Sequence, residues 1–330
     1  MNGDFFQIWK RIDGLVMPMT DIQRMTEKTI PALMKQLNYC LNNPYRALVT
    51  AVWNQKGGVA KTTNTINIGA ELALAGKRVL LIDLDSQNDL TRGLGLIPDK
   101  YNSWLLECVK SISQRKIKNA REILNSVIQH RIFPTSEKEK LEIDVLPIGK
   151  YALDEFRESK GQYQGFSAAK VFPRIIDLLT PSFDYIFIDT SPAADQLTRS
   201  LMYSIDSLLI PIDHGKKSIY HGVRIHKKIK EVRESRKKVK TLHLGPWNLG
   251  LVYSNCPADA GKRLDQMIDQ ELDKHCFSGK RYNEVIRTFA QTKVAEFKQM
   301  PVVCWRQSQI TKCYQELVKE VFINPNFINE

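Results

Sequence analysis

A glycine-rich turn lies between a short apolar run and a helical stretch, and this order restricts the fold more than any other feature of the chain. Residues 47–53 have the composition of a buried strand, and residues 62–75 have helical spacing that ends at Gly76. A strand, a glycine turn and a helix N-terminus in this order gather backbone N–H groups and the positive end of a helix dipole at one point, where anions bind. The segment therefore predicts an α/β fold with a phosphate-binding loop.

The residues of this loop have the types that phosphate binding requires. Lys61 is placed to reach the terminal phosphates of a nucleotide, and the hydroxyl of Thr62 is placed to bind Mg²⁺. Ala60 stands where the general phosphate-loop pattern has its last glycine. The predicted nucleotide contacts in the loop are Gly57, Gly58, Val59, Ala60, Lys61, Thr62 and Thr63.

The rest of the chain alternates between apolar runs and helical segments. Further strands are expected at 78–83, 143–147, 185–189, 207–212, 249–254 and 284–288, and helices at 103–129, 167–180, 217–239, 259–275 and 307–322. Near-continuous Val, Ile and Leu runs are typical of strands that helices cover on both faces. We predict a doubly wound, mostly parallel sheet with helices on both faces, formed by one domain over 47–330, and a separate N-terminal helical extension over 1–46.

Composition excludes several classes of protein. No stretch has the ~18 uncharged apolar residues that a bilayer crossing needs, and we expect a cytoplasmic protein without a signal peptide. The six cysteines are scattered and form no C-x-x-C pair, which favours free thiols over disulfides or a thiolate metal site. The net charge of +12 indicates a polyanionic partner.

Three aspartates lie at or just after the ends of predicted strands. Asp83 and Asp85 come at the end of the run at 78–83, and Asp189 ends the run at 185–189. A carboxylate next to nucleotide phosphates is repelled unless Mg²⁺ lies between them. We therefore expect these carboxylates and a magnesium ion to share one site.

With Lys56 and Lys61 the loop reads K-G-G-x-x-K-T-T, and over residues 47–322 the chain resembles the deviant-Walker ATPases ParA and MinD, which are P-loop NTPases of the SIMIBI type. The resemblance implies ATP and Mg²⁺ as cofactors, with Thr62, Asp83 and Asp189 around the metal. It implies that Asp85 orients the attacking water. It also implies that Lys56 crosses a dimer interface to the γ-phosphate of the other subunit, so Lys56, Lys61 and Asp85 are the catalytic candidates.

Two weaker matches extend the resemblance toward the nucleotide base. Pro211, in the run at 207–212, and Asn255, after the run at 249–254, match positions where ParA chains approach adenine. The order of motifs from Val285 to Glu320 also follows that of the end of ParA proteins. We interpret Pro211 and Asn255 as candidate adenine contacts.

A strongly basic segment lies between residues 216 and 240. It holds eleven Lys and Arg residues against two Glu, and Ile219, Val223, Ile229 and Val232 form an apolar stripe along it at helical spacing. Basic residues crowded on the other side of such a helix predict contact with the phosphates of DNA without sequence preference. The candidate DNA contacts are Lys227, Lys228, Lys230, Arg233, Arg236, Lys237, Lys238 and Lys240.

The resemblance implies a weak, nucleoid-associated ATPase that forms an ATP-dependent homodimer, binds DNA and partitions a plasmid or chromosome, with a ParB-like partner that stimulates hydrolysis. One alternative is a positioning ATPase for a protein cargo such as a carboxysome. Another is a MinD-like membrane-associated ATPase, although residues 323–330 lack the basic amphipathic helix that would bind a membrane. Iron-protein-like reductases and cobyrinic-acid amidation enzymes are disfavoured because the chain shows neither cluster-bridging cysteines nor room for a glutamine-hydrolysing domain.

Overall fold

A single eight-stranded sheet forms the centre of the molecule in the computed structural model, which describes residues 47–158, 168–193, 196–237, 246–257, 262–275, 277 and 281–323. The strand order is β3-β4-β2-β5-β1-β6-β7-β8. The strands are β1 (Leu48–Val52), β2 (Val79–Leu84), β3 (Gln129–Pro134), β4 (Lys140–Leu146), β5 (Tyr185–Thr190), β6 (Ser207–Ile212), β7 (Trp247–Cys256) and β8 (Arg281–Arg287). Only β3 pairs antiparallel to its neighbour among these strands, so the predicted doubly wound, mostly parallel sheet is confirmed.

Both faces of the sheet are buried, which explains why the strand sequences are apolar without alternation. In β5, Ile186 and Ile188 belong to one core, whereas Tyr185 and Phe187 belong to the other. Successive side chains of a strand point to opposite faces, so such a strand is apolar along most of its length, and polar residues such as Asp189 come at its end. The sheet is therefore the middle layer of three.

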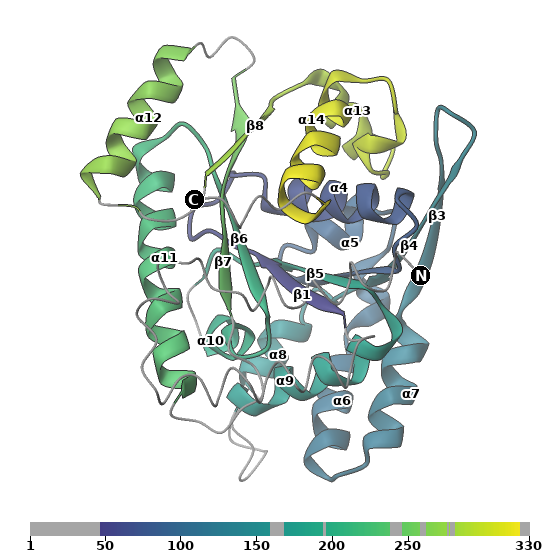
Figure 1. The fold of residues 1–330 in the computed structure, drawn as a ribbon. Helices are drawn as coiled ribbons and strands as arrows, with labels where there is room; N and C mark the ends of the chain where they lie inside the picture. Colours follow the sequence, from purple (N-terminus) through teal and green to yellow (C-terminus); the bar gives the residue numbers. More distant parts are fainter. Residues whose placement is uncertain are drawn as a thin grey trace, which may run out of the picture.

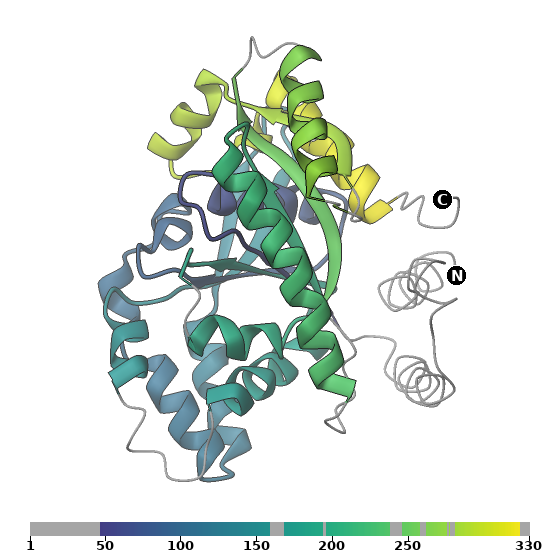
Figure 2. The ribbon, with the colours of Figure 1, turned by 90° about the vertical axis from the view of Figure 1, so that its left-hand side faces the viewer.

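Helices form the two outer layers (Figures 1 and 2). Figure 1 shows α4 and α14 above the central strands and α6 to α9 below them, while α11 runs along β6 and β7. The helices are α4 (Lys61–Leu74), α5 (Asp89–Gly93), α6 (Trp104–Ser113), α7 (Ile117–Val127), α8 (Ala152–Glu158), α9 (Ala168–Leu179), α10 (Gln196–Met202), α11 (Lys216–Lys237), α12 (Lys262–Lys274), α13 (Ala290–Phe297) and α14 (Gln309–Val318). Short 3₁₀ turns lie at Pro98–Tyr101, Thr180–Ser182 and Val302–Cys304, and a π-helical turn at Lys319–Ile323.

The chain differs from the sequence expectation in several places. The helices α5, α8, α10 and α13 were not expected, and two further differences have a local cause. The single helix expected over 103–129 is two helices, because Arg115 between α6 and α7 has a left-handed backbone with φ 59°. The strand β3 was not expected at all; its sequence QHRIFP is half polar because it lies at the edge of the sheet. The N-terminal extension over 1–46 lies outside the described residues.

The parallel strands bring their carboxyl ends to one edge of the sheet. The loops after β1, β2, β5, β6 and β7 therefore lie together, and this edge is where open α/β sheets place their ligands. Asp83 and Asp189 are direct neighbours in the register of β2 and β5, and Val52 is the neighbour of Asp189 in β1. None of the described helices has the length and apolar composition needed to cross a membrane.

Candidate functional site

The loop between β1 and α4 takes a strained, compact path. Gly58 and Ala60 both have left-handed backbones, with φ 75° and 59°. For alanine this conformation costs about 1 kcal/mol, which is the physical reason why the general phosphate-loop pattern has glycine at this position. The amide Nδ2 of Asn255 donates to the Gly58 carbonyl at 3.0 Å, and Nδ2 of Asn54 donates to the Pro211 carbonyl at 2.8 Å. The loop is thus held near its beginning by β6 and in its middle by β7.

The first turn of α4 presents a cation and a hydroxyl at the carboxyl edge of the sheet. Lys61 is only 7% exposed, and Thr62 donates its Oγ1 hydrogen to Oδ2 of Asp189 at 2.6 Å. No acidic residue lies in this turn, and Ala60 makes no side-chain cap. Positive charge therefore concentrates at the N-terminus of α4.

Two buried carboxylates lie next to this cation. Asp83 and Asp189 are both fully buried. Burial raises the pKa of Asp83 to about 6, although hydrogen bonds from Thr91 and Asp85 work in the opposite direction. Burial and then the charge of Asp83 raise the pKa of Asp189 well above its ordinary value, while the hydrogen bond from Thr62 opposes the rise. Two neighbouring carboxylates in such surroundings are stabilised by an added cation.

Asp83 has hydrogen bonds that the sequence did not reveal. Its Oδ2 accepts from the backbone N and the Oγ1 of Thr91 at 2.9 and 2.6 Å, and its Oδ1 accepts from the backbone N of Asp85 at 3.0 Å. These contacts tie the end of β2 to α5. Asp83 therefore shapes the segment that carries Asp85, and its proposed place in the magnesium shell remains a prediction.

Asp85 lies close to the two fully buried carboxylates, and, besides burial, its charge raises the pKa of both. It is 7% exposed, and its Oδ1 accepts from the backbone N of Gln87 at 3.1 Å. The structure thus brings Lys61, Thr62, Asp85 and Asp189 to one edge of the sheet, and their roles with nucleotide and metal stay predictions.

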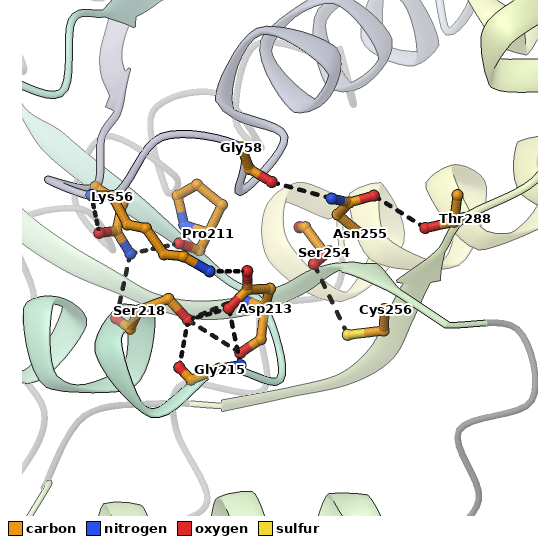
Figure 3. A network of polar contacts seen from close by, with 11 residues as sticks. Lys56, Gly58, Pro211, Asp213, Gly215, Ser218, Ser254, Asn255, Cys256 and Thr288 are labelled. Carbon is orange, nitrogen blue, oxygen red and sulfur yellow. Dashed lines mark hydrogen bonds and ion pairs between the residues drawn. The ribbon is translucent and has the colours of Figure 1, made fainter.

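Lys56 has a partner that the sequence did not reveal. Its Nζ forms an ion pair with Oδ2 of Asp213, just after β6, and its backbone N donates to Oδ1 of Asn54 at 2.9 Å (Figure 3). Asp213 is one of many acidic residues and lies 157 positions from Lys56, so neither motif nor spacing could single it out. In the single chain, the lysine expected to act on a second subunit is held by its own subunit.

The two candidate adenine contacts lie near the loop but have different surroundings. Pro211 is buried in β6, whereas Asn255 is exposed near the end of β7 and has a left-handed backbone at φ 55°. Besides holding Gly58, Asn255 accepts at Oδ1 from the Thr288 hydroxyl at 2.9 Å (Figure 3). Thr288 thereby fixes which way the Asn255 amide points, and the adenine role of both candidates stays a prediction.

The basic segment forms most of α11. Ile219, Val223 and Ile229 are buried as expected, and Lys227 and Lys230 are exposed. Lys216, Lys217 and Arg224 are also exposed on this helix, although they were not among the candidates. Lys228 is half-buried. Arg233, Arg236 and Lys237 are described only as part of the helical backbone, and Lys238 and Lys240 lie outside the described residues.

Comparisons with known proteins agree with this geometry. A family model described as "AAA domain" matches residues 47–242. The sporulation initiation inhibitor protein Soj of Bacillus subtilis is 28% identical over 288 residues, which cover 84% of this chain and 98% of Soj. The chromosome-partitioning ATPase Soj of Treponema pallidum is 24% identical over 273 residues, which cover 81% of this chain and 94% of that protein.

A solved structure shows the same fold. The septum site-determining protein MinD of Pyrococcus horikoshii, complexed with Mg-ADP, superimposes with a TM-score of 0.60 at 16% identity and covers 84% of this chain and 96% of MinD. At this identity the likeness concerns the fold alone. The matched family model, the two relatives and the site together show that the chain belongs to the AAA-domain family and is a P-loop ATPase of the ParA/MinD type.

Proposed function

We propose that the chain is a ParA-like partition ATPase whose ATP-bound form is a homodimer on DNA. The observation that carries the proposal is the meeting of Lys61, Thr62 and the carboxylates of Asp85 and Asp189 at the loop after β1. The loop would bind ATP, Lys56 of each subunit would reach the phosphates of the other, and a ParB-like partner would accelerate a slow hydrolysis. The relatives named for chromosome partitioning favour DNA as the cargo over a protein organelle or a membrane.

The residues at the site fit a magnesium nucleotide. Besides burial, the charge of Asp83 raises the pKa of Asp189, an effect that a cation between the two carboxylates would offset, and Thr62 already points its hydroxyl at Asp189. An added Cβ at Gly57 or Gly58 would meet none of the described atoms within 4 Å, so there is open space beside the loop. The described residues hold no cluster of three His, Cys, Asp or Glu side chains suited to a metal, so phosphate and water oxygens would have to complete the coordination of Mg²⁺.

Each residue at the edge has a distinct role in the proposal. Backbone N–H groups of residues 57–63 hold the phosphates, and Lys61 offsets their charge. Thr62 and Asp189, supported by Asp83, hold the metal. A magnesium ion bound there would supply positive charge beside the phosphates. Asp85 accepts a hydrogen bond from the attacking water and aims it at the γ-phosphorus, while Pro211 and Asn255 lie toward the base.

Replacing Asp85 with alanine is expected to trap the ATP-bound dimer. Without a carboxylate to orient water, hydrolysis should fall on the order of 10²-fold, whereas nucleotide affinity should change little because Asp85 does not hold the phosphates. Phosphate release and sedimentation in ATP measure both properties. Hydrolysis by Asp85→Ala at the rate of the unaltered protein would show that Asp85 does not orient the attacking water.

The helix α11 is the proposed DNA-binding surface. Its apolar stripe is packed on the sheet, so Lys216, Lys217, Arg224, Lys227 and Lys230 face outward. Contacts of this kind reach backbone phosphates and carry no sequence preference. Arg233, Arg236 and Lys237, on the last turns of the helix, are proposed as further contacts; the candidates Lys238 and Lys240 lie outside the described residues.

Reversing charge on α11 is expected to weaken DNA binding. Lys227→Glu together with Lys230→Glu should lower the affinity of the ATP form for DNA by about tenfold or more and reduce the slope of affinity against salt concentration by about two. Fluorescence anisotropy of labelled duplexes at several salt concentrations measures both effects. Lys118→Glu together with Arg121→Glu, on exposed positions of α7, is the matched control and should leave binding unchanged. An equal loss of DNA affinity in both variants would show that the net charge of the protein, and not the surface of α11, determines binding.

The proposed function is tested by retention on DNA of random sequence. The ATP form should bind, and the ADP form and the nucleotide-free protein should not. Equal retention on DNA with ATP, with ADP and without nucleotide would contradict the proposal of an ATP-switched partition protein. Residues 1–46 are proposed to form a separate extension, and retention by a chain that begins at residue 47 would show whether DNA binding depends on them.

A further inference from the structure

The ion pair between Lys56 and Asp213 holds the ammonium group of Lys56 against its own subunit. The Lys56 side chain is 27% exposed and the Asp213 side chain 10% exposed, so the pair is largely shielded from water. Burial alone would raise the pKa of Asp213, but the pair with Lys56 and hydrogen bonds from Ser218 and Gly215 outweigh burial and lower it. The carboxylate is thus ionised at neutral pH and holds the ammonium group firmly.

Asp213 is itself anchored to the beginning of α11 (Figure 3). Its Oδ1 accepts from the backbone N of Gly215 at 2.9 Å and from the Ser218 hydroxyl at 2.6 Å. Ser218 also accepts at Oγ from the backbone N of Asp213 at 3.1 Å. The carboxylate therefore caps α11 with one oxygen and holds Lys56 with the other.

A second contact joins the same two segments. Asn54 accepts the backbone N–H of Lys56 at Oδ1, and its Nδ2 donates to the carbonyl of Pro211 at 2.8 Å. A Cβ added to Gly215 would lie 3.3 Å from Nζ of Lys56, which shows how closely the beginning of α11 approaches this lysine. The start of the phosphate loop and the start of the basic helix form one connected unit.

Lys56 cannot serve Asp213 and a second subunit at once. In the proposed dimer its ammonium group moves to a γ-phosphate outside its own subunit, and Asp213 close to that phosphate would oppose binding by charge repulsion. Dimerisation therefore has to break the ion pair between Lys56 and Asp213. Asp213 then keeps its contacts with the beginning of α11 but loses its contact with the phosphate loop.

We propose that Asp213 is a positioning residue that holds Lys56 back in the single subunit, and that release of Lys56 on ATP-dependent pairing is passed directly to α11. This inference rests on the proposed function, because it takes Lys56 as the residue that crosses the interface. It explains how nucleotide state reaches the DNA-binding helix through one carboxylate.

The test is the isosteric variant Asp213→Asn. Asparagine keeps an oxygen that can cap α11, so the fold is retained, but it loses the charge that holds Lys56. With ATP the dissociation constant of the dimer should fall about tenfold, because each subunit no longer has to break its own ion pair. Nucleotide affinity of the isolated subunit should change less than about twofold. Sedimentation and a fluorescent ATP analogue measure the two constants.

A labelling measurement probes the pair without nucleotide. Acetylation of Lys56 by acetic anhydride, followed by mass spectrometry, should be several-fold faster in Asp213→Asn than in the unaltered protein. Asp184→Asn is the matched control, because Asp184 forms an ion pair with Arg78 at the opposite edge of the sheet. The control should change neither dimerisation nor Lys56 labelling.

The outcomes separate this proposal from the proposed function. If the unaltered protein dimerises with ATP and Asp213→Asn dimerises equally or less well, Asp213 does not hold Lys56 back and the proposal is overturned. Equal labelling of Lys56 in both proteins would overturn it as well. If the unaltered protein stays monomeric with ATP, the proposed function fails first, and the coupling to α11 fails with it.

Discussion

Lys61→Ala is expected to abolish measurable nucleotide binding. Lys61 is the buried cation at the N-terminus of α4, and removing a buried charge from a charged ligand costs about 2–5 kcal/mol, which lowers affinity on the order of 10²-fold or more. The buried carboxylates beside Lys61 increase this loss of nucleotide affinity. Its charge lowers the pKa of Asp189, so its removal leaves the carboxylates facing the phosphates without this compensation. Calorimetric titration with ATP and Mg²⁺ measures the affinity.

The control for this variant has to show that the fold is intact. Lys110→Ala removes an exposed lysine of α6 and should bind nucleotide normally, and circular dichroism of Lys61→Ala should match that of the unaltered protein. Nucleotide affinity within about threefold of normal in Lys61→Ala would show that the loop does not hold the phosphates. In that case the site would have to be sought elsewhere.

Lys56→Ala is expected to separate nucleotide binding from dimerisation. Lys56 points to Asp213 and away from its own loop, so the isolated subunit should bind ATP almost as well without it. The dimer should be lost, since two lysines per dimer no longer offset phosphate charge and the dissociation constant rises on the order of 10²-fold or more. Titration with nucleotide and sedimentation with ATP measure the two effects on the same sample.

A refinement of this test removes the charge that Lys56→Ala leaves unpaired. Lys56→Ala together with Asp213→Asn has no isolated carboxylate at the beginning of α11, so a fold defect would be repaired in the double variant. The dimer should remain absent, because the trans lysine is still missing. Normal dimerisation of either variant with ATP would show that Lys56 does not act across the interface.

Much of the fold could be predicted because its strands are buried on both faces. In a doubly buried strand such as β5 the first four residues, Tyr185 to Ile188, are all apolar or aromatic, so this run stands out from the polar segments around it. The strand β3 could not be found in this way, because an edge strand has an exposed face with polar residues. The break between α6 and α7 depends on one left-handed residue, Arg115, which has no sequence signal.

The candidate site was predictable only where a residue belongs to a local motif. Lys61 and Thr62 belong to one eight-residue loop motif, and Asp189 comes at the end of an apolar run that is typical of a strand. Asp213 and Thr91 escaped prediction because their roles arise from contacts in space. Asp213 contacts Lys56 although the two residues are 157 positions apart in the sequence. Thr91 donates to Asp83 only because α5 turns back on β2. Tertiary contacts of this kind need a structure.

The mass of the protein in solution with different nucleotides tests the central claim most directly. The claim is that triphosphate charge, offset by Mg²⁺ and by lysines from both subunits, joins two copies of the chain. In sedimentation equilibrium, Asp85→Ala with ATP and Mg²⁺ should have about twice the subunit mass of 37.9 kDa, and with ADP the mass of one subunit. One subunit mass under both conditions, or the dimer mass under both, would contradict the account.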